Sequence, residues 1–130
     1  MIGLDTSAII DLFRGKPEIK GFFESNKEPL AATIVSYLEL FFGLNPSDPK
    51  HGAEGECYRK FFEGIYNISL THQACEEASR IFWNLKKEGR IIEQYDCLIG
   101  ALLIKNGITK ILTKNPKHFG RIKGLTVLTY

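Results

Sequence analysis

The chain has 130 residues, of which 44% are hydrophobic and 25% are charged. This length predicts one domain, with a core large enough to fold without disulfides. The three cysteines lack a C-x-x-C spacing, which argues against a zinc site or a redox pair, and we expect them to be reduced core residues. No apolar run approaches the ~20 residues that cross a bilayer, so we expect a cytoplasmic protein without membrane association.

The net charge of +2 hides an asymmetry along the chain. Residues 1–96 include 11 basic and 15 acidic residues, whereas residues 97–130 include six basic residues and no acidic one. Basic side chains that gather on one face attract polyanions such as RNA. The sequence leaves open whether these six share a face or are scattered: Lys105, Lys110, Lys114, Lys117, Arg121 and Lys123.

Signals for strands and helices alternate along the chain. Short apolar runs predict strands, and apolar residues at helical spacing predict the helices between them. Thr33 and Thr71 are expected N-caps, and Gly43 and Gly107 are expected to end helices. Residues 44–55 are rich in Pro, Gly, Asn and Ser and predict a loop. The expected strands are 2–4, 30–32, 66–70, 110–113 and 126–129, and the expected helices are 8–13, 17–23, 34–42, 58–65, 72–88 and 95–106.

Strands that alternate with helices through short connections give a mostly parallel sheet covered on both faces. We therefore predict an α/β fold, a three-layer sandwich with a mostly parallel central sheet. In such sheets the active crevice lies beyond the carboxyl ends of the strands. Two strand ends carry polar residues suited to that place: Asp5 follows the first strand, and Thr113 to Asn115 follow the fourth.

Two further carboxylates lie within otherwise apolar helices, Glu39 in the third and Asp96 at the start of the last. Buried carboxylates are costly, and several in one crevice repel one another unless a cation lies between them. Oxygen ligands without a Cys or His cluster select a hard ion, Mg²⁺ or Mn²⁺. Each acid also has a simpler role that stays open: Asp5 as an N-cap, Asp96 as a charge that stabilises the helix dipole, and Glu39 as a solvated residue at the edge of an apolar face.

Four short blocks contain these residues: Leu4-Asp5-Thr6-Ser7-Ala8-Ile9-Ile10, Ser36-x-x-Glu39 followed by Gly43, Asp96-Cys97-Leu98-Ile99-Gly100-Ala101, and Leu112-Thr113-Lys114-Asn115-Pro116-Lys117-His118-Phe119. In content and order they resemble the four blocks of PIN-domain ribonucleases, and in particular the VapC-type toxins of prokaryotic toxin–antitoxin pairs. The blocks together are specific, whereas Asp-Thr-Ser alone is weak.

The resemblance implies a PIN-like fold, with residues 1–130 forming a single PIN-like nuclease domain. It implies a metal-dependent endoribonuclease that hydrolyses RNA phosphodiester bonds, with RNA as substrate and an antitoxin protein as partner. Asp5, Glu39 and Asp96 would be the metal ligands for Mg²⁺ or Mn²⁺. The supporting hydroxyls would be those of Thr113 and of either Ser7 or Thr6.

One position departs from the family's pattern. Asn115 stands where many members carry an aspartate, so it offers an amide oxygen but no charge, and the number of bound ions stays open. Glu93, three residues before Asp96, either makes up this charge or forms a surface ion pair. A metal-free route through the ribose 2′-hydroxyl would need His72 or His118, which lack a partner motif; we expect His118 to face RNA or solvent.

The aromatic doublets at 22–23, 41–42 and 61–62 exceed what one face of each helix needs. We expect a homodimer with a groove that binds an amphipathic antitoxin segment. The expected groove residues are Phe13, Phe22, Phe41 and Phe42. Alternatively, successive members of each doublet pack into a two-sided core.

Two other classes also begin with an aspartate after a first strand. A phosphatase of the haloacid dehalogenase type needs a second Asp where Ser7 stands, and a phospho-receiver domain needs an adjacent acid where Thr6 stands. Both are excluded by these positions. Two readings remain beside the toxin: a PIN-like module that binds RNA or protein with little or no nuclease activity, and a housekeeping RNA-processing nuclease.

Overall fold

The computed structural model describes residues 1–130, which form five strands and seven helices. Every expected strand and helix is present. Most ends differ by a few residues, but α4 begins nine residues before the expected start at 58, and one short helix, α7, was not predicted. The elements are β1 (Ile2–Leu4), α1 (Thr6–Phe13), α2 (Pro17–Ser25), β2 (Leu30–Thr33), α3 (Ile34–Phe42), α4 (Pro49–Glu63), β3 (Tyr66–Ile68), α5 (His72–Lys87), α6 (Gln94–Lys105), β4 (Lys110–Leu112), α7 (Pro116–Phe119) and β5 (Thr126–Leu128).

The five strands form one sheet in the order β3-β2-β1-β4-β5, and every strand pair is parallel. Gly3 of β1 pairs with Ala31 on one side and with Ile111 on the other. The chain builds outward from β1 to β3 and then crosses back to place β4 and β5 beyond the other edge of β1. The sheet therefore reverses its direction of growth between β1 and β4, and ligands of open α/β sheets bind at such a point.

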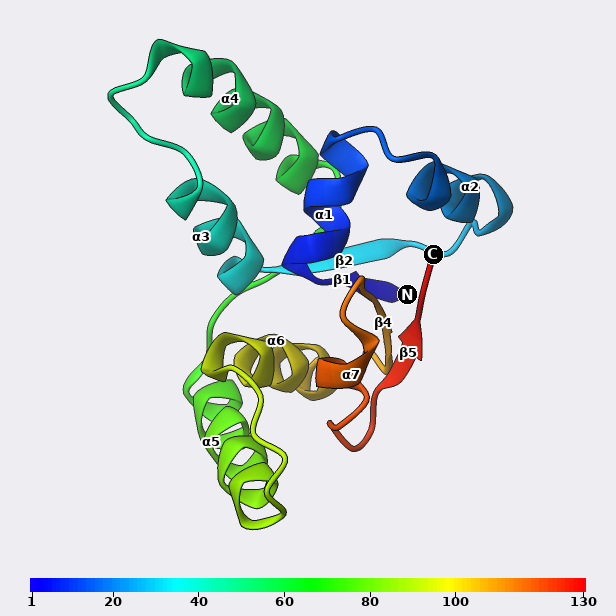
Figure 1. Ribbon diagram of the computed structural model, residues 1–130, viewed down its shortest axis with the longest axis vertical. Helices are drawn as coiled ribbons and strands as arrows, with labels where there is room; N and C mark the ends of the chain where they lie inside the picture. Colours follow the sequence, from blue (N-terminus) through cyan, green and yellow to red (C-terminus); the bar gives the residue numbers. More distant parts are fainter.

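Helices cover both faces of this sheet (Figure 1), with α1, α2 and α4 on one side and α5, α6 and α7 on the other. Successive residues of β2 face opposite cores: Ala31 packs with residues of α5 and α6, whereas Ala32 packs with residues of α1. Helix α3 contributes Val35 to the first core and Leu40 to the second. The predicted three-layer sandwich is confirmed.

Helix α6 packs directly on β1 because Gly3 has no side chain. A Cβ at Gly3 would lie 2.6 Å from both terminal methyl carbons of Leu103, and Leu103 is fully buried. This close packing holds α6, which carries Asp96 in its first turn, against β1, which ends just before Asp5.

The predicted loop at 44–55 is wrong in its second half, because α4 begins at Pro49. The Asp48 side chain accepts a hydrogen bond from the Lys50 amide, and a proline suits the first turn of a helix. Gly55 lies within α4 and is buried, with a Cβ position 3.4 Å from Phe41, so it faces α3 and does not form a turn.

The prediction of three buried cysteines is correct only for Cys97, since Cys57 and Cys75 are exposed on α4 and α5. None of the helices combines the length and the apolar composition that crossing a bilayer requires.

Candidate active site at the carboxyl ends of β1 and β4

Asp5 lies between β1 and α1 and is 3% exposed. Its Oδ1 accepts hydrogen bonds from the Ala8 amide at 2.9 Å and from the Ser7 hydroxyl at 2.8 Å. Its Oδ2 accepts from the Thr113 hydroxyl at 2.7 Å. Asp5 therefore is the N-cap of α1, and its carboxylate keeps free lone-pair capacity for a further partner.

The turn after β4 is bonded to the same carboxylate. The Thr113 side chain is fully buried, and its oxygen also accepts from the Asn115 amide at 2.8 Å. The Lys114 amide donates to the Ser7 hydroxyl oxygen at 3.1 Å. Residues 113–115, called the β4–α7 corner below, are thus tied to Asp5 both directly and through Ser7. This agrees with the expectation that the two polar strand ends meet.

Glu39 reaches the site from α3 and is partly buried. Its Oε1 accepts a hydrogen bond from the Thr6 hydroxyl at 2.6 Å, and the Thr6 oxygen lies 3.0 Å from the Ser36 hydroxyl. The sequence left open whether Thr6 or Ser7 supports the site. The structure gives each a separate partner: Ser7 bonds Asp5, and Thr6 bonds Glu39.

Asp96 lies in the first turn of α6, with a side chain that is 16% exposed. Its Oδ2 lies 3.0 Å from Nδ1 of His118, which belongs to α7. The His118 side chain is 44% exposed, in keeping with the expected solvent contact, but no sequence pattern indicates its bond to Asp96.

The acids lie close enough to affect one another's protonation. Burial raises the pKa of Asp5, of Glu39 and of Asp96 above the usual carboxyl value. Hydrogen bonds from Thr113, Thr6 and His118 oppose this effect, each at its own acid. The negative charge of Asp96 raises the pKa of both Asp5 and Glu39 further. The three carboxylates therefore form one electrostatically coupled group.

These side chains do not yet form a complete ligand shell, because no three Asp, Glu, His or Cys groups converge as ligands of one ion. The donor chemistry fits a hard cation nevertheless. The coupled group offers carboxylate oxygens only, in a partly buried crevice where their repulsion disfavours ionisation, and a divalent cation would remove that repulsion.

The sequence left the roles of Glu93 and Asn115 in the site open, and the structure places the two residues differently. Glu93 occupies the N-cap position of α6 without a capping hydrogen bond, makes no ion pair, and raises the pKa of both Glu39 and Asp96 through its charge. It thus lies with the acids and not in a surface ion pair. Asn115 is exposed and its side chain makes no hydrogen bond; only its backbone is bonded, to Thr113 and to the His118 amide.

The six basic residues of the last segment do not share one face. Lys110 lies at the start of β4 and pairs with Glu28, while Lys105 at the end of α6 lies 3.7 Å from Glu77. Lys114 and Lys117 follow β4 and are exposed beside the site. Lys114 follows Thr113, which bonds Asp5, and Lys117 precedes His118, which bonds Asp96.

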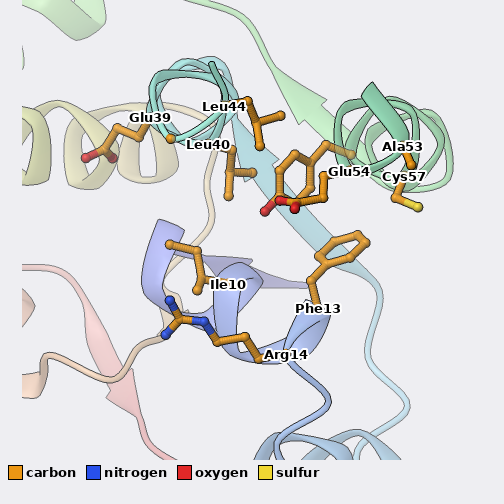
Figure 2. Close-up of a pocket in the computed structure, with 11 residues that line it drawn as sticks. Ile10, Phe13, Arg14, Glu39, Leu40, Leu44, Ala53, Glu54 and Cys57 are labelled. Atoms are coloured by element: carbon orange, nitrogen blue, oxygen red, sulfur yellow. The ribbon is translucent and has the colours of Figure 1, made fainter. Parts of the chain in front are cut away.

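A groove of about 650 Å³ lies between α1, α3 and α4 (Figure 2). Of the four phenylalanines expected to line it, only Phe13 does. Phe42 is 72% exposed elsewhere on α3, which leaves it outside the groove. Figure 2 shows Glu39 at one end of the groove, so the groove leads to the acidic group. The apolar lining consists mainly of Ile10, Phe13, Leu40, Leu44 and Tyr58.

The PIN domain family model matches residues 2–125 of the chain. Ribonuclease VapC of Rickettsia bellii is 35% identical over 130 residues, which cover 97% of this chain and 93% of that protein. The structure of VapBC-1 from nontypeable Haemophilus influenzae superposes with a TM-score of 0.83 at 26% identity, over 99% of this chain and 98% of that chain. A toxin–antitoxin complex from Klebsiella pneumoniae shares the fold, with a TM-score of 0.76 at 21% identity over 97% and 96% of the two chains. The chain therefore belongs to the PIN domain family, in its VapC ribonuclease branch.

Proposed function

We propose that this protein is an endoribonuclease that cleaves RNA in the cytoplasm with the help of Mg²⁺ or Mn²⁺, and that it is the toxin of a toxin–antitoxin pair. One observation carries the proposal: three electrostatically coupled carboxylates lie at the point where the sheet reverses its growth, in a chain whose relatives are named ribonucleases. Residues 1–130 act as a single nuclease domain.

Asp5, Glu39 and Asp96 would hold the cation. When bound, a divalent cation stabilises the negative charge that develops on the phosphate and favours its attack by water. Ser7 and Thr113 fix the orientation of the Asp5 carboxylate, and Thr6 fixes that of Glu39. A carboxylate held by hydrogen bonds from a rigid turn loses little freedom when it takes up a ligand.

The residues after β4 would contact the RNA backbone. Lys114 and Lys117 are exposed beside the acids, where their charges attract phosphates and partly offset the repulsion between RNA and the carboxylates. Asn115 would add an amide oxygen to the crevice. It adds no negative charge, so we expect modest affinity for the cation.

The groove between α1, α3 and α4 would bind the antitoxin. Its apolar lining and its volume of about 650 Å³ suit the apolar face of an amphipathic helix. Because Glu39 lies at its end, a bound segment would also restrict access to the acids.

A different surface would join two copies of the chain. Ile34, Leu38 and Phe42 are exposed at intervals of four residues and form one apolar stripe along α3. We propose that this stripe lies in a homodimer interface, which light scattering at micromolar concentration tests. Leu38→Glu should yield monomers, whereas a wild type that is itself monomeric would contradict the dimer.

The activity is tested with a labelled pool of structured prokaryotic RNA. Cleavage should need Mg²⁺ or Mn²⁺ and stop with EDTA, and Asp96→Asn should lower the rate by about 100-fold or more. Glu56→Gln, which changes an exposed acid of α4 paired with Arg59, serves as the control and should keep full activity. Full activity in Asp96→Asn or in EDTA would contradict the metal mechanism. Growth arrest on expression, abolished by Asp96→Asn, separates the toxin from a housekeeping nuclease.

A further inference from the structure

A network of ion pairs around one buried carboxylate lies beside the acidic group and has no part in the proposed metal binding. At its centre is Asp11, which is 2% exposed on α1. The Tyr130 hydroxyl donates to its Oδ2 at 2.8 Å, and Nζ of Lys114 lies 3.8 Å from the same oxygen. On the other side, Nζ of Lys16 lies 3.5 Å from Oδ1. All polar atoms of the buried carboxylate are thus partnered.

Ser7 and Asp11, one turn apart on α1, contact the backbone and the side chain of Lys114, respectively. Residues four positions apart lie on the same face of a helix, so Ser7 and Asp11 both face the β4–α7 corner. Ser7 accepts a hydrogen bond from the Lys114 backbone amide, and Asp11 pairs with the Lys114 side chain. The same Ser7 hydroxyl donates to both oxygens of Asp5.

Tyr130 supports the corner from the other side. Thr113 donates its backbone amide to Leu128 at the end of β5, and Tyr130 follows two residues later. The bond between Tyr130 and Asp11 therefore closes a ring of contacts that runs from α1 through the corner to β5 and back. The hydroxyl of Thr113, which bonds Asp5, lies within this ring.

A buried charge is a poor choice for stability alone. Burying the Asp11 carboxylate costs free energy, and its lysine partners are 39% and 52% exposed, where ion pairs contribute little to stability. Although burial raises the pKa of Asp11, the Tyr130 bond and the charges of Lys114 and Lys16 outweigh it and lower the pKa below the usual value. Asp11 therefore stays ionised, as an anchor for Lys114 and Tyr130 requires.

We propose that Asp11 is a positioning residue of the active site: together with Tyr130 it fixes the β4–α7 corner, and so the orientation of Thr113 and Ser7 toward Asp5. This inference rests on the proposed ribonuclease function for its effect on turnover. Its structural part, the fixing of the corner, does not depend on that function.

Two variants test the inference. Tyr130→Phe removes only the hydroxyl and leaves every charge in place, whereas Asp11→Asn removes the central charge. In both, amide hydrogen exchange at Lys114 in the metal-free protein should be about tenfold faster than in the wild type. With saturating Mg²⁺, kcat on an RNA substrate should fall about tenfold while KM changes less than twofold, because misplaced groups act on the transition state rather than on binding.

Glu28→Gln is the matched control. It breaks the pair with Lys110 at the opposite end of β4 and should change neither the Lys114 exchange rate nor kcat. If Asp11 and Tyr130 only stabilise the fold, both variants should melt at a lower temperature but keep the wild-type Lys114 exchange rate and kcat. That result would overturn the inference. If the wild type cleaves no RNA, the proposed function fails, while the Lys114 exchange rates still decide whether Asp11 and Tyr130 fix the corner. If Asp11→Asn does not fold, Tyr130→Phe alone decides.

Discussion

Thr113 connects the two halves of the site at the scale of single residues. Its hydroxyl donates to Asp5 and accepts from the Asn115 amide, so one buried oxygen links the end of β1 to the β4–α7 corner. Its loss removes one donor from the buried carboxylate of Asp5 and the acceptor of the Asn115 amide, so it costs more than a single weak hydrogen bond.

Thr113→Val, which keeps the shape but not the hydroxyl, should lower the free energy of unfolding by about 1–3 kcal/mol. The ribonuclease rate should fall as well, because Asp5 loses one of the donors that orient it. Urea unfolding and an RNA cleavage assay measure the two effects. Thr113→Ser keeps the hydroxyl and should preserve most of the activity; equal losses in both variants would show that the methyl group, and not the bond, matters.

Asn115→Asp should tighten metal binding if its side chain turns toward the acids when the ion binds. The added carboxylate attracts a divalent cation strongly in a partly desolvated cleft. Calorimetry with Mn²⁺ should show a dissociation constant lower by about tenfold. Asn67→Asp on β3 adds the same charge away from the site and should change the dissociation constant for Mn²⁺ by less than about twofold. If both variants bind Mn²⁺ more tightly by a similar factor, the effect comes from overall charge and not from a ligand at position 115.

Elements with local signals could be predicted from the sequence. Thr33 and Thr71 cap α3 and α5 as expected, because a threonine before an apolar repeat carries its own signal. The start of α4 was missed, since the glycines of its first turns resemble turn residues, although Gly55 lies within the helix and is buried. The strand order had no local signal, because parallel pairing depends on contacts between distant segments.

The same limit applies to the site. The acids and hydroxyls could be predicted because they follow strand ends or lie within family blocks. The bond between His118 and Asp96 joins residues 22 positions apart, and the bond between Tyr130 and Asp11 joins residues 119 positions apart. Neither Asp11 nor Tyr130 belongs to a pattern that singles it out, so only the folded chain assigns them a role.

The packing of α6 on β1 carries a prediction of its own. Gly3→Ala should lower the free energy of unfolding by about 1–3 kcal/mol, because the side chain of the fully buried Leu103 would have to move to admit the new methyl group. In a Leu103→Val background the same substitution should cost less, and a double-mutant cycle from urea unfolding measures the difference. Strict additivity of the two substitutions would contradict the contact.

For the molecule as a whole, the acidic group makes stability depend on pH and on the metal. The pKa values of Asp5, Glu39 and Asp96 are raised in the folded chain, so the folded state holds these protons more tightly than the unfolded state does. The protonated forms of these three acids therefore stabilise the fold below pH ~4, and this stabilisation is lost as the pH rises through their raised pKa values. Asp11 acts in the opposite sense: its lowered pKa stabilises the fold above pH ~4, and this is lost on acidification.

Asp96→Asn should therefore raise the melting temperature of the metal-free protein at pH 7. The substitution removes a charge that raises the pKa of both Asp5 and Glu39, and relief of about 1 kcal/mol corresponds to roughly 4 °C for a chain of this size.

Mn²⁺ should stabilise the wild type by about 2.7 kcal/mol at 100 times its dissociation constant, and should stabilise Asp96→Asn far less at the same concentration. Differential scanning calorimetry at pH 5 and pH 7, with EDTA or Mn²⁺, measures both effects. The gain from Asp96→Asn should shrink at pH 5, where more of the group is protonated already. A variant that melts below the wild type in EDTA at pH 7 would show that the hydrogen bond from His118 outweighs the repulsion among the acids.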